Sequence, residues 1–265
     1  MNESYNNEKI LEFIDITKKF GGLAAIDNFN GFLRKSELLG LIGPNGAGKT
    51  TLFNLITAIY KPDIGKILFE NQDISSKKPH QITQLGIART FQNIRLFQDM
   101  SVLENVLVSQ HLKLKSWLWL FKSVLKTRGY LRMERNMQEK AWELLEETGL
   151  SLYANDKASS LPYGLQRKLE IARALATDAK ILLLDEPAAG MNPHETNELM
   201  EFIKHIKDKF NLSIIIIEHD MKVIMGICER IYVIDYGKKI AEGTPEEIQN
   251  NPLVIKAYLG EEVAI

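Results

Sequence analysis

Short apolar runs alternate with amphipathic segments along the chain. The runs Leu38–Ile42, Ile181–Leu184 and Ile214–Ile217 are too short for buried helices, and polar residues or a glycine follow each of them. Such runs are typical of strands that are covered on both faces in a parallel sheet. The segment His194–Phe210 has a helical period instead, with its apolar face at Leu199, Phe202, Ile203, Ile206 and Phe210.

This alternation predicts an α/β fold with a mainly parallel sheet and flanking helices. We also expect Ile10–Thr17 and Gly31–Leu39 to form a separate antiparallel β layer. A chain of 265 residues with 45% apolar content is long enough to bury the core of one such domain.

A glycine-rich turn joins the first apolar run to a helical pattern that begins near Lys49. Its sequence, GPNGAGKTT, matches G-x-x-x-x-G-K-[ST], and its place between a strand and a helix indicates a nucleotide site. Glycines let successive backbone N–H groups face one concavity, and the helix N-terminus adds partial positive charge, so phosphate oxygens fit there. Lys49 would reach the β- and γ-phosphates of a nucleotide, and Thr50 would ligate Mg²⁺. The predicted nucleotide-binding residues of this turn are Gly43, Pro44, Asn45, Gly46, Ala47, Gly48, Lys49, Thr50 and Thr51.

The second apolar run ends in two adjacent carboxylates, Asp185 and Glu186. Ligands of open α/β sheets bind at the carboxyl ends of the strands, so we expect both acids beside the glycine-rich turn. Asp185 would hold Mg²⁺ through water, and Glu186 would polarise an attacking water. Solvated acids after a strand are common, but the glycine-rich turn upstream favours the catalytic interpretation.

The third apolar run leads to His219, whose ring would bond the γ-phosphate and the attacking water. A lone histidine after a strand is more often structural, but its position at the end of a third buried strand favours the site. With these segments the chain resembles the ATP-binding subunits of ABC transporters over nearly its full length. The resemblance implies a P-loop NTPase fold of the ABC type, with an antiparallel β layer and an inserted helical subdomain.

The resemblance also implies roles for two single residues. Phe20 matches the aromatic residue that stacks on adenine, and Gln92 matches the glutamine that joins the metal site to the helical subdomain. The implied metal ligands are Thr50, Gln92 and Asp185. The implied catalytic residues are Lys49, Gln92, Glu186 and His219.

A signature loop and a crossing loop complete the resemblance. Leu161–Arg167, LPYGLQR, matches the signature LSGGQ, and Ala188–Asn192 matches the loop that crosses to an opposing subunit. Pro162 lacks the hydroxyl and N–H of the signature serine, and Asn192 lacks the charge of the usual aspartate. Gly164 and the following helix N-terminus would then contact the opposing γ-phosphate, and a heterodimer with unequal sites is favoured over a homodimer. The implied nucleotide contacts of the signature are Tyr163, Gly164 and Gln166.

Several segments look like those of importers of branched-chain amino acids. They are the signature with Gln166–Leu175, then Glu186–Pro193, Ile217–Met221 and the ending Glu242–Gly260. In those importers the longer of two ATPase subunits has extra residues before the signature. The segment Leu112–Tyr130 is such an extension, so the chain resembles the longer subunit.

The resemblance implies a single ABC ATPase domain over 1–265, with 1–92 and 161–265 as the core and about 93–160 as the helical subdomain. It implies ATP and Mg²⁺ as ligands. The implied partners are two integral membrane permease subunits, a second ATPase subunit and an extracytoplasmic solute-binding protein. The chain itself would lie on the cytoplasmic face of the membrane.

The resemblance leaves two alternatives. One is the ATPase of another ABC system, such as lipopolysaccharide export, whose signature usually keeps the serine. The other is a soluble ABC ATPase, which usually has two nucleotide domains.

Composition adds few constraints. The net charge of −1 gives no indication of nucleic acid as a partner. Cys228, the one cysteine, is expected on a helix, excludes an internal disulfide and fits a reducing compartment. We see no signal peptide pattern, and no apolar run reaches the roughly 20 residues that span a bilayer, so the membrane pathway is expected from other chains.

The segment Lys113–Lys140 is unusually basic, with eight Lys or Arg and two Glu around the run Trp117–Phe121. Such a stretch can lie on an anionic membrane surface or bind nucleic acid. The more ordinary interpretation is a helical lobe whose apolar face packs internally. We expect the lobe first, with membrane or partner contact as the alternative.

Overall fold

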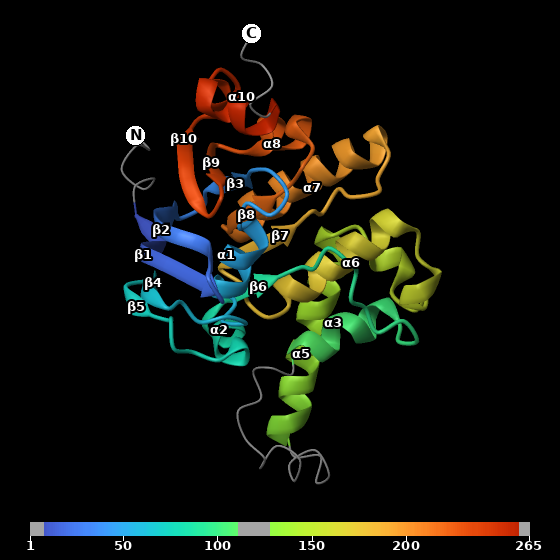
Figure 1. Cartoon of the computed structure of the whole chain (residues 1–265). Helices are drawn as coiled ribbons and strands as arrows, with labels where there is room; N and C mark the ends of the chain where they lie inside the picture. Colours follow the sequence, from blue (N-terminus) through green and yellow to red (C-terminus); the bar gives the residue numbers. More distant parts are fainter. Residues whose placement is uncertain (1–7, 111–127, 260–265) are drawn as a thin grey trace, which may run out of the picture. The chain divides into compact units, whose positions relative to one another are not determined.

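The computed structural model describes residues 8–110 and 128–259, which fall into two compact units (Figure 1). Of these, residues 8–92 and 180–259 belong to the first unit, and residues 93–110 and 128–179 belong to the second. The first unit is built from two sheets and the helices that cover them. The second unit consists mainly of helices, so all the predicted strand-end residues lie in the first.

The larger sheet of the first unit contains, among the described residues, five parallel strands and one antiparallel edge strand. The predicted strands are confirmed as β3, β7 and β8, and every residue in these three is buried. Because the three are adjacent and parallel, the residues that follow them meet at one edge of the sheet. In spatial order the strands are β10 (Lys238–Gly243), β9 (Arg230–Asp235), β3 (Leu38–Ile42), β8 (Ser213–Ile217), β7 (Ile181–Asp185) and β6 (Ile87–Arg89).

The smaller sheet is antiparallel, which confirms the β layer expected from the sequence. Its order is β2 (Leu23–Arg34), β1 (Lys9–Phe20), β4 (Ile64–Phe69) and β5 (Gln72–Asp73). One expected boundary is wrong. The stretch Gly31–Leu39 is not one strand, because Ser36 has a φ of 57° and breaks the extended backbone between β2 and β3.

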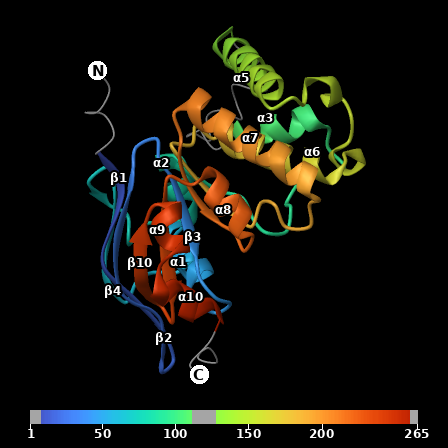
Figure 2. The same cartoon turned by 90° about the horizontal axis from the view of Figure 1, so that it is seen from above.

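Helix α1 (Lys49–Ile56) packs into a core that both sheets share. Its buried Phe53 belongs to one apolar cluster with Phe13 and Phe29 of the antiparallel sheet and with Leu183 of β7. Figure 2 shows the strands β1, β2 and β4 running together along one side of this unit. The other helices of the unit are α2 (Pro79–Leu85), α7 (Pro193–Phe210), α8 (Met221–Ile227), α9 (Pro245–Gln249) and α10 (Pro252–Leu259).

Two sequence predictions concern the helices α7 and α8. The amphipathic helix expected over His194–Phe210 is confirmed as α7, which buries Leu199, Phe202, Ile203 and Ile206. Cys228 does not lie on a helix, which corrects the prediction. It is the buried residue that ends α8, because its extended backbone leads the chain into β9.

The second unit contains α3 (Val102–Gln110), α5 (Arg128–Glu147) and α6 (Tyr163–Leu175), with short 3₁₀ turns at Ser151–Tyr153 and Ala158–Ser160. Helix α3 packs on both α5 and α6, and Val106, Leu145 and Leu169 are fully buried. Because of this packing, residues 161–179 belong to the second unit. The sequence had predicted that the helical subdomain ends near residue 160.

The basic segment 113–140 is described only in part. Residues 113–127, with the tryptophan-rich run, lie outside the described residues, so the membrane and lobe interpretations stay predictions. The remainder forms the first part of α5. None of the helices within 8–110 and 128–259 combines the length and the apolar content that a bilayer crossing requires.

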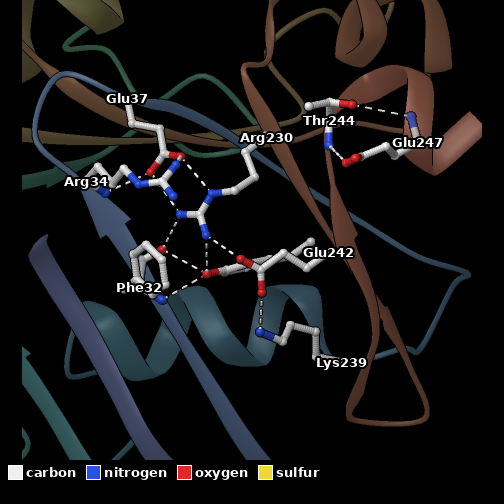
Figure 3. Close-up of polar contacts among 9 residues, drawn as sticks. Phe32, Arg34, Glu37, Arg230, Lys239, Glu242, Thr244 and Glu247 are labelled. Carbon is white, nitrogen blue, oxygen red and sulfur yellow. Dashed lines mark hydrogen bonds and ion pairs between the residues drawn. The ribbon is translucent and has the colours of Figure 1, made fainter. Parts of the chain in front are cut away.

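A buried ionic network joins β2 to β9 and β10 in the first unit (Figure 3). Arg230 lies at its centre and donates to both carboxylate oxygens of Glu37 at 2.7 and 2.9 Å. It also donates to the Glu242 carboxylate at 2.5 Å and to the Phe32 carbonyl at 2.7 Å. The side chains of Arg230 and Glu37 are only 8% and 2% exposed, so water screens their attraction little.

We expect Arg230→Met to lower the free energy of unfolding by about 3–5 kcal/mol, because it leaves the buried Glu37 carboxylate without its main partner. Urea unfolding followed by circular dichroism measures the change. Lys239→Ala is the matched control, since its ion pair with Glu242 lies at the rim of the network and is worth about 1 kcal/mol or less. Equal stability of Arg230→Met and the unmodified protein would contradict the role given to Arg230.

Candidate functional site

The glycine-rich turn follows β3 and is held by close backbone contacts. Gly43 has a φ of 152°, and a Cβ there would lie 2.0 Å from the Ile234 carbonyl oxygen. Gly48 has a φ of 110°, and a Cβ there would lie 2.5 Å from the Ala25 carbonyl oxygen. Only glycine fits at these two positions. The turn is thereby fixed against β2 and β9, with the unbonded N–H groups of the α1 N-terminus at its end.

Lys49 begins α1 and folds back over the turn. Its Nζ donates to the carbonyl oxygens of Gly43 at 2.6 Å and Pro44 at 2.9 Å. Burial lowers the pKa of Lys49, and the nearby carboxylates of Glu186 and Asp185 oppose that effect. The lysine charge therefore lies within electrostatic reach of both predicted acids.

Asp185 ends β7 in a buried position and is held by an arginine. Its Oδ2 accepts from Arg89 Nη2 at 2.7 Å, and Arg89 Nη1 donates to Asn54 Oδ1 at 2.7 Å. The guanidinium also lies 5.4 Å from the ring centre of Phe53 and 5.3 Å from that of Phe91. Arg89 thus ties β6, β7 and α1 together around the predicted metal-binding carboxylate. Sequence reasoning missed both Arg89 and Asn54.

Glu186 lies between two side chains that were predicted for the same site. Its Oε2 accepts from Gln92 Nε2 at 2.7 Å, and its Oε1 lies 2.7 Å from His219 Nε2. The Glu186 backbone has a φ of 48°, and its N–H donates to the Ile217 carbonyl at 2.9 Å. The structure therefore brings three of the predicted catalytic residues together around one carboxylate, which is 19% exposed.

A second buried acid, Glu218, stands beside this group and was also missed. Its carboxylate accepts from the Ala188 N–H at 2.7 Å and from the His219 N–H at 3.3 Å. Burial raises the pKa of the Glu218 carboxyl, and these two N–H groups oppose the rise. The sequence did hold a signal, because an acid at the end of a fully apolar run must find partners inside the protein.

Phe20 ends β1 in the same unit and is 44% exposed. Tyr60 supports the ring edge-on, with centroids 5.1 Å apart, and Lys18 Nζ lies 5.5 Å from the ring centre. An exposed ring that is supported from one side can offer a face to a flat heterocycle. This exposure fits the predicted adenine contact.

The predicted signature residues lie in the second unit, at the start of α6. Pro162 is the N-cap and makes no side-chain cap bond. Gln166 Nε2 donates to the Leu161 carbonyl at 2.8 Å, whereas Tyr163 is 42% exposed. Gly164 faces open space, since a Cβ there would meet nothing within 4 Å.

Asn192 has a local role that its match to the crossing loop did not suggest. Its Oδ1 accepts from the N–H groups of His194 at 2.9 Å and Glu195 at 3.0 Å, and the Glu195 carboxylate accepts from the Asn192 N–H. This capping box starts α7. Asparagine is as good an N-cap as aspartate, so the missing charge does not weaken the helix start.

The residues of the first unit fit a nucleoside triphosphate with Mg²⁺. The glycine-rich turn supplies N–H groups and Lys49 a positive charge. Among the described residues no cluster of three His, Cys, Asp or Glu side chains could enclose a metal. A Mg²⁺ ion held by Thr50 and Asp185 would therefore take phosphate oxygens as further ligands, as is usual for this ion. Thr50 is exposed in the first turn of α1.

Two family models match the chain. Residues 26–189 match the ABC transporter model. Residues 238–264 match the model of the branched-chain amino acid ATP-binding cassette transporter. The first match covers the glycine-rich turn, both acids and α6, and the second covers β10, α9 and α10.

Named proteins are similar over almost the whole chain. The high-affinity branched-chain amino acid transport ATP-binding protein LivG of Escherichia coli K12 is 49% identical over 255 residues, which cover 96% of this chain and 99% of LivG. The ADP conformation of MJ1267, an ATP-binding cassette of an ABC transporter, matches with a TM-score of 0.83 and 35% identity, covering 96% of this chain and 100% of that one. A dimeric post-hydrolysis structure of the cassette MJ0796 with ADP and Pi matches with a TM-score of 0.72 and 25% identity, covering 89% and 98%.

Proposed function

This chain belongs to the ABC transporter family, and we propose that it is the ATP-hydrolysing subunit of an importer for branched-chain amino acids. The observation that carries the proposal is Glu186, held between Gln92 and His219 at the sheet edge that also bears the glycine-rich turn. The solute is supported by LivG, which is 49% identical over 96% of this chain.

In this proposal the triphosphate of ATP lies in the turn Gly43–Thr51. The N–H groups of the turn and of the α1 N-terminus donate to its oxygens. Lys49 exchanges the carbonyl oxygens of Gly43 and Pro44 for the phosphates, a small movement for a flexible side chain. The exposed face of Phe20 stacks on adenine.

The metal site would consist of Thr50 and Asp185, with Gln92 beside them. When bound, Mg²⁺ neutralises phosphate charge and helps to align the transferred group. Arg89 fixes the Asp185 carboxylate through its Oδ2, so the carboxylate keeps one orientation. Asn54 in turn fixes Arg89, which links this orientation to α1.

Glu186 acts as the general base for the attacking water. Its carboxylate takes the proton of that water, while Gln92 and His219 keep it oriented. His219 and Lys49 stabilise the negative charge on the transferred phosphoryl group. The rate enhancement comes from positioning and from charge stabilisation, as in phosphoryl transfer generally.

A second ATPase subunit would complete each site in a head-to-tail pair. The signature residues Tyr163, Gly164 and Gln166 of this chain would cover the nucleotide of the partner, and the partner's signature would cover the nucleotide held here. The dimeric MJ0796 cassette supports such pairing. Because Pro162 offers no hydroxyl, a related but different partner chain is favoured. ATP closes the pair and hydrolysis opens it, and this difference would move the membrane subunits.

The proposed assembly includes two permease subunits and an extracytoplasmic solute-binding protein, with this chain on the cytoplasmic face of the membrane. To test it, tagged Glu186→Gln protein is captured from native membranes with ATP, and the bound chains are identified by mass spectrometry. We expect two different permease chains and a second ATPase. Lipopolysaccharide exporter components would contradict the importer, and the absence of membrane proteins would contradict a transport role.

Phe20→Ala is expected to weaken ATP binding about 5- to 150-fold, because stacking on a base is worth about 1–3 kcal/mol. Isothermal titration calorimetry measures the affinity. Phe20→Tyr should keep the affinity of the unmodified protein, because tyrosine offers the same ring. Leu23→Ala should also keep it, since Leu23 is an exposed apolar residue of the same hairpin outside the predicted contact. Wild-type affinity in Phe20→Ala would remove the adenine contact.

A further inference from the structure

Glu218 is a buried acid for which the hydrolysis scheme gives no role. It is 4% exposed and lies between Ile217, the last residue of β8, and His219. One carboxylate oxygen accepts from the backbone N–H of Ala188 and the other accepts from the backbone N–H of His219. The two oxygens thus bridge two separate segments of the chain.

Each of these segments carries one residue of the catalytic pair, which consists of Glu186 and His219. Ala188 lies two residues after Glu186, and the His219 ring contacts the Glu186 carboxylate at 2.7 Å. The Glu186 N–H donates in addition to the carbonyl of Ile217, the residue before Glu218. The side-chain contact, the backbone contact and the Glu218 bridge together form a closed set of bonds around Glu186.

The backbone of Glu186 needs such a set of bonds. Its φ of 48° lies in the left-handed region, which is strained for a non-glycine residue. A conformation of this kind persists only where surrounding contacts hold it. The Ala188 N–H bond to Glu218 lies just beyond the strained residue and restrains the chain there.

We propose that Glu218 is a positioning residue for ATP hydrolysis, which holds Glu186 and His219 in register by bridging the Ala188 and His219 backbones. The proposal rests on the hydrolytic function proposed above. Glu218 also bonds the beginning of the Ala188–Asn192 loop, so one carboxylate links that loop to the His219 backbone. This loop is the segment that was matched to the crossing loop, and Glu218 is therefore placed to connect the partner subunit with the catalytic pair.

Glu218→Gln tests the bridge at nearly constant size. An amide has one acceptor oxygen, so only one of the two N–H groups keeps its bond, while the amide NH₂ faces the other donor. Because small misplacements of catalytic groups reduce rates strongly, we expect kcat for ATP hydrolysis to fall about 10- to 100-fold. The KM for ATP should stay within about twofold of that of the unmodified protein, since the glycine-rich turn is unchanged. The number of ATP sites per chain should be the same.

Asp220→Asn is the matched control for loss of charge next to His219. Asp220 lies on the other side of His219 and caps α8 through the Lys222 N–H, a bond that asparagine can also make. Its kcat should remain that of the unmodified protein. An equal loss in Asp220→Asn would assign the effect to local charge and overturn the bridge.

Combination with Glu186→Gln separates positioning from general stability. If Glu218 acts through Glu186, adding Glu218→Gln to Glu186→Gln should reduce single-turnover hydrolysis of radiolabelled ATP by less than about threefold. A fall in the hydrolysis rate of about 10- to 100-fold both with Glu186 and with Glu186→Gln would overturn the proposal. Should Glu218→Gln fail to fold, Glu218→Asp repeats the test, because its shorter side chain cannot span both N–H groups.

The two proposals fail in different ways. Absence of ATP hydrolysis by the assembled transporter with the unmodified chain would refute the proposed function itself. An unmodified protein that hydrolyses ATP, together with a Glu218→Gln variant of equal kcat, would refute only the role of Glu218.

Discussion

Glu186→Gln is expected to bind ATP with nearly unchanged affinity and to hydrolyse it at least about 100-fold more slowly. The amide has the same shape and can still bond Gln92 and His219, which contact the carboxylate at 2.7 Å each. It cannot take a proton from water, so the chemical step loses its base. The variant should also trap the ATP-bound pair. Phosphate release assays measure turnover, and size-exclusion chromatography with ATP detects the trapped pair.

Glu195→Gln is the control for this substitution. Glu195 is a carboxylate of the same unit that closes the capping box of α7, and glutamine can serve in that box. Its turnover should match that of the unmodified protein. Normal turnover of Glu186→Gln would reject Glu186 as the base and would leave the acid a structural ligand of Gln92 and His219.

Lys49→Ala is expected to weaken ATP binding by at least about 100-fold, because charged hydrogen bonds contribute about 1.5–3 kcal/mol each. The ammonium now bonds the carbonyl oxygens of Gly43 and Pro44 within the turn, so it lies where phosphate oxygens would enter. Removing it takes away a positive charge that interacts electrostatically with both Glu186 and Asp185. Fluorescence titration with a labelled ATP analogue measures the affinity.

Lys61→Ala controls for the loss of a positive charge in the same unit, since Lys61 is exposed and lies outside the turn. It should bind ATP like the unmodified protein. Equal affinity of Lys49→Ala and Lys61→Ala would contradict the assignment of the turn as the phosphate site.

The sequence predicted the strand-end residues well because their positions follow from short-range pattern. The runs that became β3, β7 and β8 are fully apolar, and the carboxyl ends of adjacent parallel strands must share an edge. Asp185, Glu186 and His219 could therefore be placed together without knowledge of any contact.

The partners of these residues could not be predicted, because they depend on strand register. Arg89 reaches Asp185 because β6 pairs with β7 so that Arg89 lies opposite Leu183. Glu218 reaches Ala188 because Asp185 pairs with Ile217. Hydrophobic periodicity identifies strands but does not specify which residues face each other across them.

Local backbone exceptions explain the remaining errors. Ser36 has a positive φ, which ended β2 earlier than the pattern Gly31–Leu39 indicated. Asp15 and Asn28 also have positive φ values, in strands whose register shifts near them. Positive φ values of this kind can rarely be predicted from the pattern of apolar and polar residues. The packing of α6 on α3 is a long-range contact, so the boundary of the units between residues 179 and 180 could not be read from the sequence pattern.

The central claim is that ATP hydrolysis by this chain drives uptake of a branched-chain amino acid. The most direct measurement is uptake of radiolabelled leucine into right-side-out membrane vesicles, loaded with ATP and supplied with the solute-binding protein. Vesicles from cells with the unmodified chain should accumulate leucine, and vesicles from cells in which Glu186→Gln replaces it should not. Equal accumulation in both would contradict the claim.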